Sequence, residues 1–318
     1  MTWTWNKKVS TLIASGLWIA FATSSVAELP PANQVSPVLI AKVAKYSEGI
    51  VFDHAGNGYI SHQDTITKVA PDGATSVFAV TGSPNGHKIL ADGSHLVCDA
   101  SHHAVLHLDA QGKMLEPACK EYNGKPLQGP NDLSLDPAGG FYFTDPGESS
   151  DVKPIGTVHY VDAKGKVHLV NDKLAYPNGI VLRPGGKAVL YGESKKNRIL
   201  EQEVLGNGTF GPARVFADLP AKEGSQVDNQ PDGICLDAAG NLYVAHYGMG
   251  QVQVLDPKGK LIARYPGGNI LTSNVAFGGK KMDQLFVTGA INADGAPGAL
   301  FRLDLGVPGL VILPAKSK

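Results

Sequence analysis

The chain has 318 residues, of which 43% are hydrophobic and 18% charged, and its formal net charge is −1. Without a cluster of basic and aromatic residues, this composition argues against nucleic-acid binding and favours a small, neutral or weakly charged ligand. The 38 glycines and 21 prolines fall between apolar runs, which indicates an all-β protein rich in turns.

The N-terminal segment has the pattern of an export signal. Lys7 and Lys8 precede an uncharged apolar run over residues 9–22, and small residues follow as far as Ala27. This pattern predicts a signal peptide over residues 1–27. A membrane anchor is the alternative, but the run falls short of the roughly 20 residues needed to span a bilayer. We expect an exported protein, periplasmic or secreted, that is not bound to a membrane after cleavage and folds as one domain over residues 28–318.

A hairpin pattern repeats along the rest of the chain. In the copy over residues 177–193, Asn178 precedes the apolar run 180–182, a Pro-Gly turn follows, and a second β-rich run returns. The six copies begin at anchor residues that are all polar: Glu48, Asn85, Asn131, Asn178, Asp232 and Ser273. Successive anchors lie 37 to 54 residues apart, close to the length of one propeller blade. The repeats predict a six-bladed β-propeller.

A second repeat supplies further strands. The segments 106–113, 160–166 and 254–260 each contain a strand, a tight turn with glycine and the start of another strand. Two hairpins per repeat give four strands. Residues 39–45 and the final segments 299–305 and 310–313 are candidates to share the last blade, which would remove an open sheet edge.

Four anchors carry oxygen atoms that suit a metal ion. If the first hairpin of each repeat lies innermost, Glu48, Asn131, Asn178 and Asp232 meet in the central channel. Carboxylate and amide oxygens favour calcium or magnesium and leave positions open for water and substrate. Taken singly, an Asn-Gly or Asp-Gly pair is also a common turn signal. The shared register, and a glutamate that no turn requires, favour a metal site in the channel.

Further polar residues lie close to these anchors in the sequence. His246 and His87 are candidates for contacting substrate at the channel wall and mouth, and packing between blades is the alternative for each. Asn131 is a candidate for substrate contact as well as for metal binding. Asp132 either fixes the orientation of Asn131 without binding the metal itself or only marks the start of a strand.

The three cysteines leave one question open. Cys98 and Cys119 fall within one repeat and could form a disulfide in an oxidising compartment, or remain two buried thiols. Cys235 alternates with apolar neighbours and is expected in the core. No Cys-x-x-Cys or paired-histidine spacing of a zinc cluster occurs.

The sequence resembles the family of senescence marker protein 30, gluconolactonases and related lactonases. The resemblance lies in the order and spacing of segments 47–49, 129–133, 139–146, 176–180, 230–233 and 241–246. It implies a six-bladed propeller with one divalent cation in the central channel. That cation is usually calcium, and magnesium and zinc remain open.

By this resemblance, Glu48, Asn131, Asn178 and Asp232 bind the metal, and Asp232 is also the acid/base that hydrolyses a gluconolactone-like or related lactone. Segment 139–145 is most similar to a bacterial lactonase branch. One position departs from the pattern. Gluconolactonases of the animal type have an arginine where this chain has Gly129, so recognition of a sugar ring by that arginine is not implied.

Two other functions are compatible with the same anchors. One is a phosphotriesterase resembling diisopropylfluorophosphatase, with a similar ligand set. The other is a non-enzymatic propeller that binds a ligand or protein on one face, with a purely structural cation. The preferred interpretation has a small-molecule lactone as partner and a monomeric or weakly oligomeric state.

Overall fold

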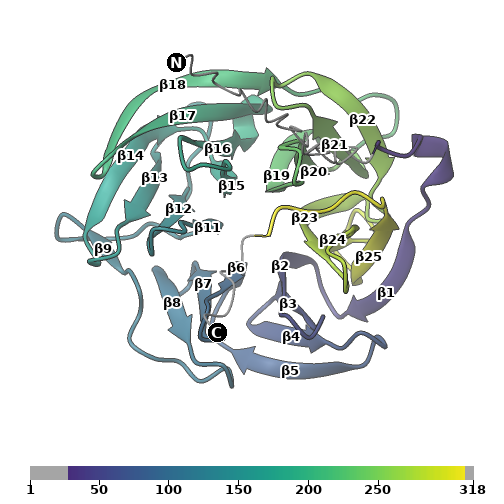
Figure 1. Cartoon of the computed structure of the whole chain (residues 1–318), viewed down its shortest axis with the longest axis horizontal. Helices are drawn as coiled ribbons and strands as arrows, with labels where there is room; N and C mark the ends of the chain where they lie inside the picture. The colour runs from purple at the N-terminus through teal and green to yellow at the C-terminus, as the bar shows by residue number, and fades with distance from the viewer. Residues whose placement is uncertain (1–27, 312–318) are drawn as a thin grey trace, which may run out of the picture.

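Six antiparallel sheets surround a central axis (Figure 1). The computed structural model describes residues 28–311, so the predicted signal peptide over residues 1–27 lies outside the described residues. The first strand of each sheet lies innermost and contacts the first strands of both neighbouring sheets. The predicted six-bladed β-propeller is confirmed.

We number the blades in chain order. Blade 1 contains β2 (Ser47–Phe52), β3 (Gly58–His62), β4 (Thr65–Val69) and β5 (Thr75–Val80), and blade 2 contains β6 (Pro84–Ile89), β7 (His95–Asp99) and β8 (Ala104–Leu108). Blade 3 contains β11 (Leu133–Leu135), β12 (Phe141–Asp145), β13 (Gly156–Val161) and β14 (Val167–Leu174), and blade 4 contains β15 (Pro177–Leu182), β16 (Ala188–Glu193), β17 (Arg198–Gly206) and β18 (Thr209–Asp218).

The remaining strands form blades 5 and 6 and one short hairpin. Blade 5 contains β19 (Gln230–Leu236), β20 (Leu242–Tyr247), β21 (Gln251–Leu255) and β22 (Leu261–Pro266), and blade 6 contains β23 (Leu271–Gly278), β24 (Gln284–Ala290), β25 (Gly298–Asp304) and β1 (Val38–Val43). Outside the blades lie the hairpin β9 (Glu121–Tyr122) and β10 (Lys125–Pro126) and the 3₁₀ turns η1 (Ala32–Gln34) and η2 (Ser194–Lys196). Within residues 28–311, no helix is long and apolar enough to cross a membrane.

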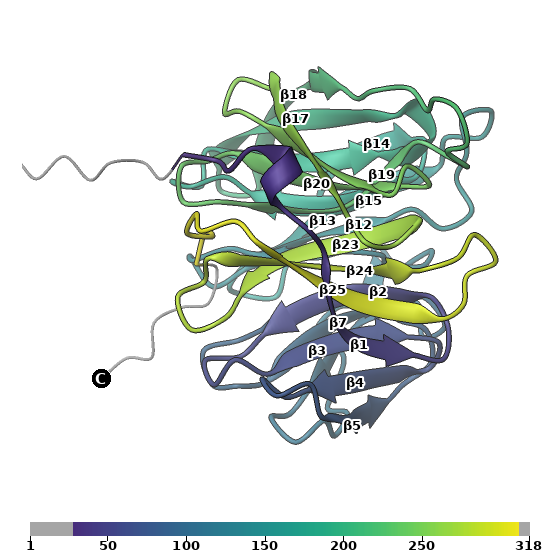
Figure 2. The same cartoon turned by 90° about the vertical axis from the view of Figure 1, so that its right-hand side faces the viewer.

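The ring is closed by pairing the two ends of the chain. β1 pairs antiparallel with β25, from Val38 opposite Arg302 to Val43 opposite Gly298. Figure 2 shows the N-terminal segment running along the outside of the molecule from η1 to β1. This confirms the prediction that residues near 39–45 and 299–305 share the last blade.

The segment predicted as a final strand over 310–313 is not a strand in its described part, residues 310 and 311. Instead, the Leu310 N–H donates to the Leu236 carbonyl at 2.9 Å, and the Ala238 N–H donates to the Pro308 carbonyl at 2.8 Å. Both contacts lie at the outgoing end of β19. The chain therefore covers the end of the channel opposite the incoming ends of the inner strands.

Blade 2 departs from the expected four strands, because only isolated bridges continue beyond β8. Val105 bridges Cys119 and Leu108 bridges Met114, while the residues between them, which include Pro117, form no ladder. Proline lacks the N–H that a strand ladder requires.

The same register decides the cysteine question. Cys98 pairs with Val105, whose other neighbour is Cys119, so a strand lies between the two thiols. Two strand spacings are about 9.5 Å, beyond the roughly 7 Å that a disulfide can bridge. Both cysteines are buried free thiols, and so is Cys235.

The hydrophobic core is divided into six layers, each between consecutive blades. Ile66 of blade 1 packs with Val97 and Leu108 of blade 2, and Tyr243 of blade 5 packs with Leu285 of blade 6. The other four blade interfaces have equivalent clusters. Because every blade is buried on both faces, the inner strands are held in fixed positions around the channel.

Candidate metal centre

The predicted ligands lie at the incoming ends of the inner strands. Glu48 is in β2, Asn178 in β15 and Asp232 in β19, while Asn131 lies two residues before β11. Asn131, Asn178 and Asp232 are 6–8% exposed, and Glu48 is partly buried. Because the inner strands run in the same direction around one axis, their incoming ends gather at one mouth of the channel (Figure 1).

The glycine that follows three of these anchors has a packing role. A β-carbon on Gly49 would collide with the carbonyl oxygen of Asn85, and one on Gly179 with the carbonyl oxygen of Asp232. A β-carbon on Gly233 would collide with the side chain of Asn274. These Gly residues lie inside strands, so the alternative that the Asn-Gly and Asp-Gly pairs mark turns is wrong. Glycine is required because neighbouring inner strands approach too closely for a side chain.

Glu48 and Asp232 lie close enough to perturb each other. Burial raises the pKa of Glu48 well above its ordinary value, and the charges of Asp232 and Asp132 raise it further. Burial also raises the pKa of Asp232, while hydrogen bonds from Tyr46 and Asn178 act in the opposite direction. Acidic groups from blades 1, 3 and 5 therefore lie close enough to influence one another's pKa.

The residues present fit a hard divalent cation. Glu48 Oε2 is buried and has no hydrogen-bond partner among the described residues. A buried carboxylate oxygen without a partner is costly, and a cation relieves that cost. The four predicted ligands offer only oxygen atoms, which suit calcium or magnesium better than zinc. Within residues 28–311, no group of three or more His, Cys, Asp or Glu side chains is arranged to hold a metal. The metal site therefore stays a prediction, carried by a mixed set of two carboxylates and two amides.

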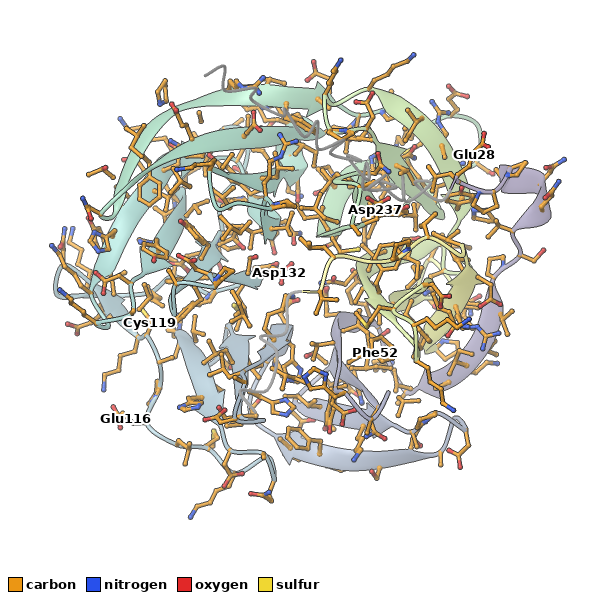
Figure 3. The ribbon with its side chains drawn as sticks, viewed as in Figure 1. Glu28, Phe52, Glu116, Cys119, Asp132 and Asp237 are labelled. Atoms are coloured by element: carbon orange, nitrogen blue, oxygen red, sulfur yellow. The ribbon has the colours of Figure 1, made fainter. Side chains whose placement is uncertain are left out.

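Asp132 lies beside the central opening, as Figure 3 shows, and is 1% exposed. Its Oδ1 accepts the Leu133 N–H at 2.8 Å and lies 3.9 Å from Lys88 Nζ. Burial raises the pKa of Asp132, and the positive charge of Lys88 is the largest effect that lowers it. This location, next to Asn131 and facing the axis, is compatible with the predicted role in orienting Asn131.

The two candidate histidines are buried between blades. His246 is fully buried, and its Nε2 lies 2.9 Å from Asn197 Oδ1 of blade 4. His87 is fully buried, and its Nε2 lies 2.6 Å from His95 Nδ1, with Tyr59 of blade 1 at its ring edge. These contacts are typical of residues that pack between blades, which is the alternative to substrate contact for each histidine. Substrate contact by either histidine stays a prediction that its surroundings do not favour.

Three tyrosines lie at the mouth, and the sequence analysis does not predict a role for any of them. The Tyr46 hydroxyl donates to Asp232 Oδ2 at 3.3 Å, and the rings of Tyr46 and Tyr247 meet edge to face at 6.1 Å. The charges of Glu48 and Asp232 contribute, after burial, to raising the pKa of Tyr176 to about 12. All three tyrosines are partly exposed.

The positions of two of these tyrosines relative to the anchors could have indicated them from the sequence. Tyr46 and Tyr176 each lie two residues before an anchor, Glu48 and Asn178, and Gly129 occupies the same position before Asn131. Tyr46 and Tyr176 each lie immediately before the first residue of an inner strand, β2 and β15, so both are close to the mouth.

Comparisons with known proteins agree with this architecture. The family model described as SMP-30/Gluconolactonase/LRE-like region matches residues 47–291. Lactonase drp35 of Staphylococcus epidermidis is 29% identical over 281 residues, which cover 84% of this chain and 82% of the relative.

Two solved structures share the fold. A gluconolactonase from Xanthomonas campestris superposes with a TM-score of 0.73 at 24% identity and covers 86% of this chain and 91% of its own. A calcium-binding protein, regucalcin, from Agrobacterium tumefaciens superposes with a TM-score of 0.70 at 22% identity, covering 85% and 96%.

Proposed function

Since the chain belongs to the SMP-30/gluconolactonase/LRE-like family, we propose that it is an exported, metal-dependent lactonase. The observation that carries the proposal is the gathering of Glu48 and Asp232 at one mouth of the channel, with Glu48 Oε2 buried and unpartnered. The lactonase and gluconolactonase relatives support the reaction class, and the calcium-binding relative supports calcium as the cation.

Glu48, Asn131, Asn178 and Asp232 would hold the cation. When bound there, a divalent cation supplies a Lewis acid for the lactone carbonyl and a positive charge that favours ionised Asp232. The buried walls around these ligands exclude bulk water and strengthen every electrostatic contact in the site.

Asp232 is the proposed acid/base. In its ionised form it takes a proton from the attacking water, whose oxygen adds to the lactone carbonyl carbon. When the bond between that carbon and the ring oxygen breaks, Asp232 returns the proton to the ring oxygen. The product is the open hydroxy acid. Tyr46 donates a hydrogen bond to Oδ2 of the Asp232 carboxylate and so restrains the orientation of this group.

The mouth suits a ring-shaped substrate of the sugar type or a related lactone. Tyr46, Tyr176 and Tyr247 offer ring faces for the C–H side of such a substrate and hydroxyls for its polar groups. Gly129 offers no side chain of its own, so we propose that the three tyrosines help to determine which lactone enters the mouth.

The test is hydrolysis of glucono-1,5-lactone, other aldonolactones and a simple aliphatic lactone by the protein that begins at Glu28. We expect turnover that EDTA abolishes and added Ca²⁺ restores. Asp232→Asn should lower kcat by at least 10²–10⁴-fold, the usual contribution of an acid/base, and more if metal binding weakens.

Asp72→Asn is the matched control. Asp72 lies in an exposed turn where its Oδ1 accepts the Ala74 N–H, and an asparagine oxygen can accept the same hydrogen bond. If the folded, calcium-loaded protein opened no lactone but cleaved a phosphotriester, the alternative hydrolase would replace the lactonase. If it did neither, the ligand-binding propeller would be favoured.

A further inference from the structure

Lys88 is a lysine directed toward the propeller axis. It belongs to β6, and its side chain is only 17% exposed. Its Nζ lies 3.1 Å from the carbonyl oxygen of His87 and 3.9 Å from Asp132 Oδ1 in the neighbouring blade. The pair therefore links the inner strands of blades 2 and 3 inside the channel.

The surroundings of Lys88 differ between the two ends of the channel. Toward the covered end of the channel lies a cavity of about 60 Å³ with an otherwise largely aliphatic and aromatic lining, in which Lys88 is the only charged residue. Toward the mouth lie the carboxylates of Asp132, Glu48 and Asp232. An ammonium group beside an apolar cavity is costly unless it is paired, so the carboxylates are the reason for a lysine at this position.

When all three carboxylates of this group are ionised, Lys88 and one divalent cation balance their charge. Glu48, Asp132 and Asp232 contribute three negative charges when ionised, and Lys88 contributes one positive charge. Two negative charges remain, which is the charge that one divalent ion neutralises. In a buried site, where the effective dielectric is low, such a balance strongly affects ion binding.

We propose that Lys88 and Asp132 form a fixed internal charge pair that sets the affinity of the metal centre for a divalent cation. Lys88 cancels the charge of Asp132, so that Asp132 can hold the chain beside Asn131 without itself acting as a ligand. Both are positioning residues. This inference rests on the proposed function, because it presupposes a cation at the four ligands.

Four variants separate charge from packing. Lys88→Met keeps the length of the side chain and matches the apolar cavity, Asp132→Asn keeps the shape, and the double variant restores the net charge of the wild type. Lys120→Met is the matched control, because it removes the lysine of an exposed ion pair whose Glu116 partner has a side chain 83% exposed.

Calorimetric titration of each metal-free protein with CaCl₂ measures the predicted effect. Asp132→Asn should weaken Ca²⁺ binding at least tenfold, since it removes one negative charge near the ion. Lys88→Met should bind at least as tightly as the wild type. The double variant should return to within about threefold of the wild-type Kd, as expected when two groups interact, and Lys120→Met should not change it.

Thermal unfolding in EDTA gives a readout that needs no metal. Lys88→Met should lower Tm more than the double variant does, because removing one partner leaves a buried charge unpaired. Lys120→Met should leave Tm unchanged, as is usual for an exposed pair. If Lys88→Met does not fold, the double variant compared with Asp132→Asn still decides the question.

The proposal is overturned if the double variant binds Ca²⁺ as weakly as Asp132→Asn, or if no channel variant changes the affinity. A wild-type protein that binds no Ca²⁺ would remove the metal centre and the proposed function together. The two failures are therefore distinguished by the wild-type titration.

Discussion

Tyr46 connects the structure of the mouth to the proposed chemistry. Its hydroxyl donates to Asp232 Oδ2, and a hydrogen bond from Tyr46 also lowers the pKa of Glu48. The Tyr46 phenol therefore binds the Asp232 carboxylate and lies close enough to Glu48 to affect its pKa. A group in that position orients the acid/base without taking part in bond making.

We expect Tyr46→Phe to lower kcat about tenfold with KM changed less than about twofold. The substitution removes one hydrogen bond to a charged group, worth about 1.5 kcal/mol or more. Tyr122→Phe is the control, because Tyr122 lies in the hairpin strand β9, outside the blades. Steady-state kinetics on the best lactone would contradict the assignment if KM rose and kcat stayed the same.

At the scale of the strand, the close approach of inner strands β15 and β19 shapes the mouth. Gly179→Ala would place a methyl group against the Asp232 carbonyl and force the two strands apart. We expect a loss of about 1–3 kcal/mol in the free energy of unfolding, the usual cost of overpacking, together with weaker Ca²⁺ binding.

Gly192→Ala is the matched control for Gly179→Ala. Gly192 lies in the adjacent strand β16, and a β-carbon there would have its nearest neighbour, Pro231 Cβ, at an ordinary 3.4 Å. Urea unfolding and calcium titration of both variants check the prediction. Equal effects in the two would show that glycine in these strands serves chain flexibility rather than close approach.

The interface of blades 1 and 2 contains a buried histidine pair. Burial lowers the pKa of His95 to about 4, and burial followed by the charges of His95 and Lys88 lowers that of His87 well below 6.5. Because the folded-state pKa values lie below the ordinary value, the unfolded chain binds more protons between these limits. The stability due to neutral histidines is complete above about pH 6.5 and is lost as pH falls toward 4.

The double variant His87→Gln/His95→Gln should therefore lose less stability than the wild type between pH 6.5 and 4.5. A shift from 6.5 to about 4 in His95 corresponds to at most about 3 kcal/mol. Denaturant unfolding across this range in EDTA measures the difference. His54→Gln, in an exposed turn, is the control, and parallel curves for wild type and double variant would contradict the prediction.

For the whole molecule, the decisive contact is the closure of the ring by β1. Without β1, blade 6 would end at β25 with an unpaired outer edge, and the N-terminal segment would no longer pass over blade 5. Tyr265 of blade 5 donates to the Pro30 carbonyl at 2.7 Å, which ties this segment to the ring. An exposed edge strand promotes association between molecules.

A chain that begins at residue 44 should therefore unfold at a Tm lower by about 10 °C or more and form soluble aggregates, whereas a chain that begins at residue 28 should not. Thermal unfolding and size-exclusion chromatography compare the two. If the shorter chain remained monomeric with the same Tm, the pairing of β1 with β25 would contribute little to the fold.

The propeller architecture could be predicted from local patterns in the amino-acid sequence. The hairpin repeats that begin at anchors such as Glu48, Asn178 and Asp232 recur at the spacing of a propeller blade, and a repeating alternation of apolar residues and turns is a local property of the chain. The same register placed the anchors at one end of the inner strands. The pairing of the chain ends was predicted from the strands near each terminus that belong to no complete repeat.

Which side chains meet depends on how the blades pack around the axis. His246 and His87 lie near anchors in the sequence, but the packing of neighbouring blades buries both side chains. Tyr247 and Lys88 carry no motif, and the folding of several blades around one axis brings them beside the carboxylates. Contacts between blades join residues far apart in sequence, and no local pattern records them.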